Sequence, residues 1–366
     1  MDQFEQQIDK ACVSYKELDG YLRILKHCVH EMPYVLEGNK SAEEVLFPNS
    51  KMDLVEGVYK TNKMSTYLNK MLAVGIKSYI EQKIPMLAAG EKITILEIGV
   101  GTGSSSETVL EYIAPYGEYI QYIYSDISTA FLLHGKSRFQ EKYSFIDYEL
   151  LNVENDLLTQ NVAANSIDVV FGTNVFHATK SIHNTLANIR KSMKNNGLFM
   201  LNEGTQTIDV LTLTFGMLAG WWLFEDEEIR IPHSPLLTSE SWIKALSDCG
   251  YADFLNLESV ICARANGEPV GSVRKELPAA SKKTEEASGD LYEQKIIKIL
   301  MDVLKLDLED IEVDRNIMDY GVDSILVVKI IAEIKDSCDV QLMPDVFFDC
   351  ATIENLVKYI KNEKQN

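Results

Sequence analysis

Basic residues are scarce in this 366-residue sequence, in which 35 lysines and arginines stand against 55 aspartates and glutamates and give a formal net charge of −20. Such a charge repels phosphate groups, so we expect neither nucleic acid nor a membrane as a partner. The cysteines form no C-x-x-C pair, which argues against a metal site or a disulfide framework and favours free thiols in a reducing cytoplasm. The first ten residues lack the apolar run of a signal peptide. The apolar stretch 210–224 is too short to span a bilayer.

The sequence does contain enough apolar residues, 46%, to build a sizeable core, and they are distributed over four zones. Residues 1–90 show helical spacing of apolar side chains, which predicts a helical N-terminal region. Residues 91–265 alternate short apolar runs with helical stretches, which predicts an α/β fold with a parallel sheet between two layers of helices. Residues 266–289 have the composition of a linker, and residues 290–366 that of a compact helical module. We expect strands at 93–98, 120–124, 167–171 and 198–201, and a helix at 182–193.

A glycine-rich loop follows the first predicted strand and opens a helix, with Gly99, Gly101 and Gly103 at alternate positions. Glycines allow a tight turn there and the close approach of a ligand. The acid before them, Glu97, would repel a pyrophosphate but suits the amino group and the sulfonium of S-adenosylmethionine. Asp126, at the end of the next strand, can accept both ribose hydroxyls. A turn without a ligand is the alternative, but the two acids together resemble those of the class I methyltransferases.

Two asparagines extend this predicted cofactor site. Asn152 follows the third predicted strand, where a polar residue commonly faces the adenine in that fold, and an ordinary loop asparagine is an equal alternative. Asn174 follows the fourth predicted strand, and we predict that it also binds the cofactor.

A histidine and a glutamate follow the fourth and fifth predicted strands. Because these strands are neighbours in a doubly wound sheet, we expect His177 and Glu203 together at the carboxyl edge, where open α/β sheets bind ligands. A histidine oriented by a carboxylate is a suitable general base near neutral pH. The alternative is that His177 is an ordinary core or surface histidine, and the presence of Glu203 on the adjacent strand disfavours this alternative.

The stretch from Phe215 to Phe224 is too apolar to leave in water. One hypothesis is a plain core helix. The other is a cap that closes over an apolar acyl chain and excludes water, with Trp221 and Trp222 lining a substrate tunnel.

Residues from about 50 to 262 resemble the C-methyltransferase domains of polyketide synthases. The matching stretches are LEIGVGTGSSS, YSDIS, NVFHATKSI, NEGT and FGMLAGWWLFEDEEIR. In that family a histidine–glutamate dyad removes the α-proton of a β-ketoacyl thioester and the enolate attacks the methyl sulfonium. The resemblance implies these roles for His177 and Glu203. Val100 and Ser104–Ser106 depart from the family's usual alanine and Gly-Thr-Thr run, but the three glycines remain.

The N-terminal zone also resembles part of that family, its helical lid. It carries Tyr59, Tyr67 and Asn69, and one of the tyrosines is a candidate for lining the substrate tunnel. Core packing is an equal alternative for each of them.

The last zone contains Gly321-Val322-Asp323-Ser324-Ile325 after a long acidic loop. By its position alone, Ser324 is an N-cap or first-turn residue. The G-x-D-S-[LI] motif within an acidic helical unit resembles the phosphopantetheine carrier proteins. This resemblance implies an all-α, four-helix carrier with 4′-phosphopantetheine attached to Ser324 by a phosphopantetheinyl transferase. Acidic side chains on the helix would suit docking to basic patches of partner enzymes.

We therefore expect α-carbon methylation of a carrier-bound β-ketoacyl thioester by a polyketide synthase module. The expected partners are an acyl carrier domain, in cis or in trans, and ketosynthase and ketoreductase domains. One alternative is an O-methyltransferase that acts on a carrier-bound β-hydroxy or enol oxygen. The other is an inactive scaffold that presents the carrier.

Overall fold

The computed structural model divides into two compact units, residues 1–270 and 271–366. It describes residues 2–60, 62–257, 259–266, 291–304, 306, 308, 311–320, 322, 324–338, 340, 342, 350 and 352–364. The predicted linker, 266–289, lies outside the described residues except for Asn266. Its boundaries stay a prediction.

A seven-stranded sheet forms the centre of the first unit, in the order β3-β2-β1-β4-β5-β7-β6. Its strands are β1 (Ile93–Ile98), β2 (Ile120–Asp126), β3 (Ile146–Leu150), β4 (Ile167–Thr173), β5 (Met193–Asn202), β6 (Ala252–Leu257) and β7 (Val260–Arg264). Strands β1 to β5 are parallel, as predicted. One edge of the sheet is antiparallel, because β7 pairs antiparallel with β5, and β6 antiparallel with β7. These two strands lay outside the predicted set.

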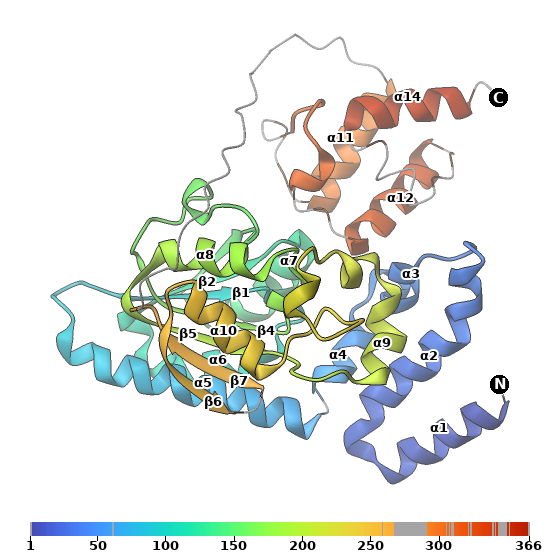
Figure 1. The fold of residues 1–366 in the computed structure, drawn as a ribbon. Coiled ribbons are helices and arrows are strands. Elements are labelled where there is room, and N and C mark those ends of the chain that lie inside the picture. The colour runs from blue at the N-terminus through green and yellow to red at the C-terminus, as the bar shows by residue number, and fades with distance from the viewer. Residues whose placement is uncertain are drawn as a thin grey trace. The chain divides into compact units, whose positions relative to one another are not determined.

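Helices cover both faces of the sheet, as Figure 1 shows. Helices α5 (Lys63–Lys83), α6 (Ser104–Ile113) and α7 (Thr129–Phe139) pack on one face, where Ile76 and Leu110 join the core around Tyr122. Helices α8 (Ile182–Ser192) and α10 (Ser239–Asp248) cover the other face, where Leu186 and Trp242 join the core around Phe199. The sheet is therefore buried on both sides, and ligands have access at the ends of its strands.

The predicted helical N-terminal region consists of α1 (Asp2–Ser14), α2 (Asp19–Leu36), α3 (Ala42–Leu46), α4 (Asp53–Lys60) and the long α5. Helices α2 and α4 approach so closely that a Cβ on Gly20 would lie 1.9 Å from the carbonyl oxygen of Gly57. Helix α2 also packs against α9 (Asp209–Thr214), which follows the carboxyl end of β5 (Figure 1). The N-terminal helices therefore contact the segment that borders the carboxyl edge of the sheet.

The second unit contains α11 (Leu291–Leu304), the short 3-10 helix η11 (Ile317–Tyr320), α12 (Ser324–Cys338) and α14 (Ile353–Glu363). Each long helix buries an apolar stripe in one small core, which includes Ile296, Leu300, Leu326, Ile330, Ile334, Leu356 and Ile360. Thr352 caps α14, because its hydroxyl accepts the N–H of Asn355. Over its described residues the regular elements of this module are helices, as predicted.

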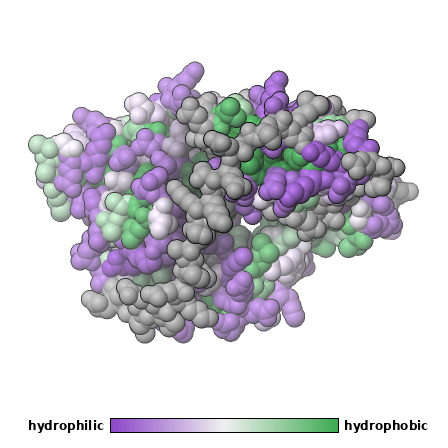
Figure 2. All heavy atoms as spheres, turned by 90° about the horizontal axis from the view of Figure 1, so that it is seen from above, coloured by the Kyte–Doolittle hydropathy of each residue, from purple (hydrophilic) through white to green (hydrophobic). Residues whose placement is uncertain are grey.

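Hydrophilic side chains separate the apolar ones into small areas on the face shown in Figure 2. This mixture agrees with the 25% of charged residues in the sequence. Over the ranges that the structure describes, no helix is both long enough and apolar enough to cross a membrane.

Candidate functional site

The predicted site residues of the first unit gather at the carboxyl edge of the parallel strands. Glu97 lies near the end of β1, Asp126 ends β2, and Glu203 directly follows β5. His177 lies in the 3-10 turn η6 (Phe176–Ala178), which follows β4. Strands β4 and β5 are neighbours, with Thr173 opposite Asn202, so the predicted adjacency of the histidine and glutamate loops is confirmed.

The glycine loop between β1 and α6 depends on its glycines for conformation and for space. All three have positive φ, and a Cβ on Gly99 would lie 2.1 Å from Cγ2 of Val175. The loop after β1 and the loop after β4 therefore touch. Beside Gly101, a Cβ would meet nothing within 4 Å, so open space adjoins the loop there.

Glu97 lies beneath this loop and is 1% exposed. Its carboxylate accepts hydrogen bonds from three hydroxyls: Ser106 at 2.9 Å, Ser105 at 3.4 Å and Tyr122 at 2.6 Å. Burial raises the pKa of Glu97 to about 7, against the lowering effect of these hydroxyls. The sequence predicted an acid at this position but gave no indication that its pKa is raised toward neutral pH.

Asp126 connects the ends of β1 and β2. Its Oδ2 accepts the backbone N–H of Gly101 (3.0 Å), and its Oδ1 accepts that of Ser128 (2.9 Å). From α7, Arg138 donates to the carbonyl of Thr102 (2.6 Å), so the glycine loop is held from two sides. The contact that we expect between Asp126 and a ribose stays a prediction.

The two asparagines lie in turns that follow strands. Asn152 Oδ1 accepts the N–H of Glu154 (2.9 Å), and the side chain of Gln160 hydrogen bonds to its backbone on both sides. This is the behaviour of a loop asparagine. Asn174 is exposed, has a φ of 49° and donates its N–H to the carbonyl of Asn202 (2.8 Å). Their roles toward a cofactor stay predictions.

His177 and Glu203 form a buried pair, with 2.5 Å between Nδ1 and Oε2. Glu203 is 1% exposed. Its other oxygen, Oε1, accepts the backbone N–H groups of Val175 (2.9 Å) and Phe176 (2.8 Å). A single carboxylate therefore holds the imidazole and the backbone of the turn that carries it.

This arrangement fixes the tautomer of the histidine. A carboxylate only accepts hydrogen bonds, so Nδ1 carries the proton and Nε2 offers a lone pair. Nε2 makes no hydrogen bond to any described residue. A neutral imidazole held in this way can accept a proton at Nε2, and Glu203 then stabilises the imidazolium.

The apolar stretch after β5 is not one core helix, so that hypothesis is wrong. Helix α9 is followed by the short 3-10 turns η7 (Phe215–Met217) and η8 (Ala219–Trp222). The ring of Trp221 lies edge-on to that of His177, with 5.7 Å between ring centroids. Trp222 is 46% exposed and donates its Nε1–H to the carbonyl of Gly216. Trp221 therefore lies beside the histidine, whereas Trp222 borders solvent.

The lid candidates differ in burial. Tyr67 is 60% exposed on α5, which excludes core packing for this side chain. Asn69, on the same helix, is buried, and its Oδ1 has no hydrogen-bond partner among the described residues. The same holds for Nε1 of Trp221. Buried polar atoms without partners are rare in native proteins and call for an explanation, such as a water molecule or a ligand. The side chain of Tyr59 lies outside the described residues.

The site also contains residues that the sequence did not single out as functional. Ser105, Ser106 and Tyr122 hold Glu97, and Asp226 with Arg230 holds the backbone around His177. The i, i+4 spacing of Asp226 and Arg230 was the available signal for the second group.

In the second unit, Ser324 begins α12. Its side chain and the preceding Gly321 and Asp323 lie outside the described residues. The attachment of phosphopantetheine to Ser324 therefore stays a prediction.

The residues around the glycine loop fit S-adenosylmethionine. The open space beside Gly101 is bordered by a loop with two acids, Glu97 below it and Asp126 bonded to it. A cationic ligand with ribose hydroxyls matches this combination of negative charge and space. Glu97, Asp126 and the loop backbone are the groups that would hold it.

Two protein families match the chain. Residues 96–199 match the family described as "Methyltransferase domain", and residues 294–360 match "Phosphopantetheine attachment site". Among solved structures, that of DszA carbon methyltransferase has a TM-score of 0.69 and 36% sequence identity, and the match covers 72% of this chain and 70% of that chain. These matches confirm the predicted class I methyltransferase fold with a carrier domain. They also imply S-adenosylmethionine and phosphopantetheine as the cofactors.

Curated relatives are much longer proteins. Polyketide synthase PksR of Bacillus subtilis (strain 168) is 34% identical over 382 residues, which cover 99% of this chain and 15% of that protein. Polyketide synthase PksM of the same strain is 33% identical over 364 residues, which cover 91% of this chain and 8% of that protein. The chain thus spans a small part of the length of these relatives.

Proposed function

Since the chain belongs to the C-methyltransferases of polyketide synthases and also contains an acyl carrier domain, we propose that it methylates the α-carbon of a β-ketoacyl thioester. The thioester is carried on the phosphopantetheine arm of an acyl carrier domain. Ketosynthase and ketoreductase domains are the partners that would supply and consume such a chain.

The pairing of His177 with Glu203 carries this proposal. The α-hydrogen of a β-ketoacyl thioester is acidic because both carbonyls stabilise the carbanion, so a neutral imidazole is a strong enough base to remove it. The 2.5 Å contact to Glu203 leaves Nε2 as the accepting atom and provides a counter-charge for the imidazolium. The two backbone donors on Glu203 keep its carboxylate in place during the transfer.

The proposed reaction begins at the α-carbon of the substrate. The α-C–H bond breaks, its proton goes to Nε2 of His177, and its electron pair stays on the substrate as an enolate. The α-carbon then forms a C–C bond to the methyl group that S-adenosylmethionine would supply, while the methyl–sulfur bond breaks, its electron pair stays on sulfur and S-adenosylhomocysteine leaves. The imidazolium then releases its proton to solvent and restores the base for the next turnover.

The surroundings of His177 suit an apolar chain with polar groups near its reacting end. The ring of Trp221 covers one side of the imidazole, and the histidine is buried, so water has little access to the enolate. Beside the imidazole, the unpartnered Nε1 of Trp221 offers a donor to a polar group of a ligand. This donor and the apolar part of the indole ring support a substrate that combines an apolar chain with carbonyl oxygens.

The carrier domain supports the same substrate class. A phosphopantetheine arm on Ser324 would present the acyl group as a tethered thioester, once a phosphopantetheinyl transferase has attached the arm. Tethering raises the effective concentration of the acyl group, so a site with few polar contacts can still be occupied. The carrier that delivers the substrate can be this one or one on another chain.

The test uses the full chain with an acetoacetyl-phosphopantetheine group loaded on Ser324 and S-adenosylmethionine labelled with ¹³C in its methyl group. We expect the label on the α-carbon, as located by NMR after release of the product. His177→Ala should reduce methyl transfer at least 1,000-fold and keep binding of S-adenosylmethionine within about twofold, as expected for loss of a general base. The matched control is His183→Ala, because His183 also pairs with a carboxylate, Asp248 (3.4 Å), but at the surface. It should keep full activity.

Two results would reject the proposal. Label on oxygen would mean an O-methyltransferase. Absence of S-adenosylmethionine binding in calorimetry would mean a scaffold that only presents the carrier. Unchanged turnover in His177→Ala would reject the assignment of the base.

A further inference from the structure

We propose that Arg230, held by Asp226, is a positioning residue that fixes the turn carrying His177. This inference rests on the proposed function for its kinetic consequence, but its structural consequence can be measured without any turnover. Among the described residues, Arg230 makes no hydrogen bond to the imidazole or to the glycine loop but does bond to the carbonyl of His177, so it would act through the backbone of that residue.

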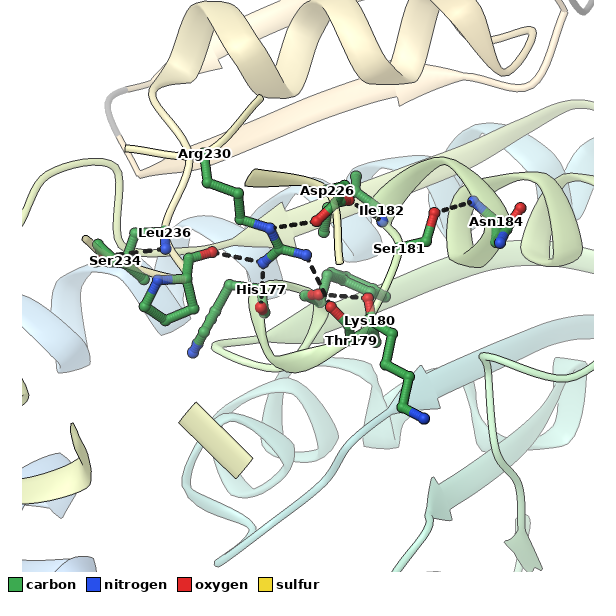
Figure 3. Close-up of polar contacts among 12 residues, drawn as sticks. His177, Thr179, Lys180, Ser181, Ile182, Asn184, Asp226, Arg230, Ser234 and Leu236 are labelled. Carbon is green, nitrogen blue, oxygen red and sulfur yellow. Dashed lines mark hydrogen bonds and ion pairs between the residues drawn. The ribbon is translucent and has the colours of Figure 1, made fainter. Parts of the chain in front are cut away.

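Arg230 is 6% exposed, and its guanidinium donates hydrogen bonds to four acceptors (Figure 3). Nε donates to Oδ1 of Asp226 (2.6 Å). Nη1 donates to the carbonyls of His177 (2.5 Å) and Pro235 (2.6 Å), and Nη2 donates to the carbonyl of Thr179 (2.8 Å). Only the planar fork of a guanidinium can reach these acceptors together, because an ammonium has three donors on a single atom.

Asp226 extends the same cluster to the start of α8. While Oδ1 binds Arg230, Oδ2 accepts the backbone N–H of Ile182 (2.7 Å), the first residue of that helix. Next to it, the N–H of Glu225 donates to the carbonyl of Lys180 (2.8 Å). We call residues 225–236 the strap. The strap is bonded to the chain between His177 and Ile182 at several successive points.

The turn of His177 is therefore held by two opposite charges. Glu203 accepts the N–H groups of Val175 and Phe176 on the entering side. Arg230 binds the carbonyls of His177 and Thr179 on the leaving side. The anion fixes the donors of the turn and the cation fixes its acceptors. Since a base must be held within about 0.5 Å of its productive position, loss of either charge should misplace Nε2.

The main test compares Arg230→Lys with Arg190→Lys in the full chain. Arg190, on α8, also donates to a backbone carbonyl, that of Gly250 (3.0 Å), but far along the helix from His177. Turnover is expressed per S-adenosylmethionine-binding site counted by calorimetry, so that misfolded protein does not contribute. We expect kcat to fall roughly 30-fold in Arg230→Lys, with the Kd for S-adenosylmethionine within about twofold, and no change in Arg190→Lys.

A second readout observes the histidine directly. In ¹⁵N-labelled protein, the Nδ1 proton shared with Glu203 gives a strongly downfield resonance, which is assigned by its loss in His177→Ala. We expect it to broaden or disappear in Arg230→Lys and to persist in Arg190→Lys. Asp226→Asn leaves the guanidinium in place and removes its counter-charge, so it should weaken this resonance. It also serves as the test variant if Arg230→Lys fails to fold.

The two readouts distinguish the two hypotheses. If the wild-type chain transfers no methyl group, the proposed function fails, while the resonance still tests the positioning role. If Arg230→Lys, or Asp226→Asn in its place, keeps both full turnover per binding site and an unchanged resonance, Arg230 has only a general structural role and the inference is overturned.

Discussion

Two glutamates at the carboxyl edge of the parallel strands, one at the end of β1 and one directly after β5, are equally buried and differ in their partners. Glu97 and Glu203 are each 1% exposed. Glu97 accepts hydrogen bonds from serine and tyrosine hydroxyls. Glu203 accepts from two backbone amides and from the imidazole of His177.

The partners decide what each carboxyl group can do. Hydroxyls can rotate and can either donate or accept, so they tolerate a protonated as well as an ionised Glu97. Its pKa, raised by burial to about 7, allows its charge to follow the arrival of a cationic ligand. Backbone amides only donate, so the Oε1 of Glu203 must remain an acceptor. We infer that Glu97 is suited to respond to a ligand and Glu203 to keep a fixed geometry.

The largest expected effect comes from Glu203→Gln. The amide can still accept from the backbone but provides no negative charge for the imidazolium, and its NH₂ group disfavours the required tautomer. We expect kcat to fall about 10³-fold, as for other general-base systems, with the Kd for S-adenosylmethionine within about twofold. Single-turnover kinetics and calorimetry measure the two quantities.

Glu97→Gln should give the opposite pattern. We expect at least tenfold weaker binding of S-adenosylmethionine and nearly normal kcat at saturating cofactor. If both variants lose affinity and turnover equally, the assignment of separate roles to the two glutamates is wrong.

The second effect is on stability as a function of pH. At pH values between 4.5, the ordinary pKa of a glutamate, and about 7, the raised pKa in the folded state, Glu97 keeps a proton that it has lost in the unfolded chain. The unfolding free energy of the cofactor-free chain should therefore be highest at low pH in this window and decrease as pH rises through 7. The decrease from this one group is on the order of 3 kcal/mol.

Tryptophan fluorescence during urea unfolding measures this effect in the first unit alone, because Trp221, Trp222 and Trp242 all lie there. Glu97→Gln is the control and should remove this part of the pH dependence. An identical pH profile in the wild type and this variant would contradict a raised pKa for Glu97.

The smallest effect is expected from Tyr122→Phe. The hydroxyl of Tyr122 lowers the pKa of Glu97, so its removal should raise the pKa further and shift the loss of stability to higher pH. Loss of the hydrogen bond should also reduce the unfolding free energy by about 1 kcal/mol. Tyr251→Phe is matched in burial and loses a hydrogen bond to the carbonyl of Leu186 (3.1 Å) on the other face of the sheet. It should reduce stability similarly without moving the pH of the decline.

The sequence predicted best those features that depend on local pattern. Strand β1 was placed at its observed bounds, since a run of six apolar-rich residues before three glycines has few other structures available. The proximity of His177 to Glu203 also followed, because each stands directly after a buried strand and parallel neighbours align their carboxyl ends. The proximity of these two side chains was therefore predictable from the sequence.

Features that depend on distant contacts were not predicted. Strand β6 is mostly exposed and mixes polar with apolar residues, so it lacks the pattern of a buried strand. Arg230 follows a run of four acids, residues 225–228, and such a charged run is typical of a solvated surface. Its burial depends on carbonyls some 50 positions earlier in the chain, at His177 and Thr179, which local sequence does not reveal.

The contact between Gly99 and Val175 has an evolutionary consequence. Because a Cβ at position 99 would lie 2.1 Å from Cγ2 of Val175, no side chain can appear at 99 unless position 175 becomes smaller or its loop moves. Val175 also donates its backbone N–H to Glu203, so such a movement would reach the pair of His177 and Glu203. Positions 99 and 175 should therefore covary among related sequences, and an exchange at one of them alone should be selected against even where the cofactor still binds.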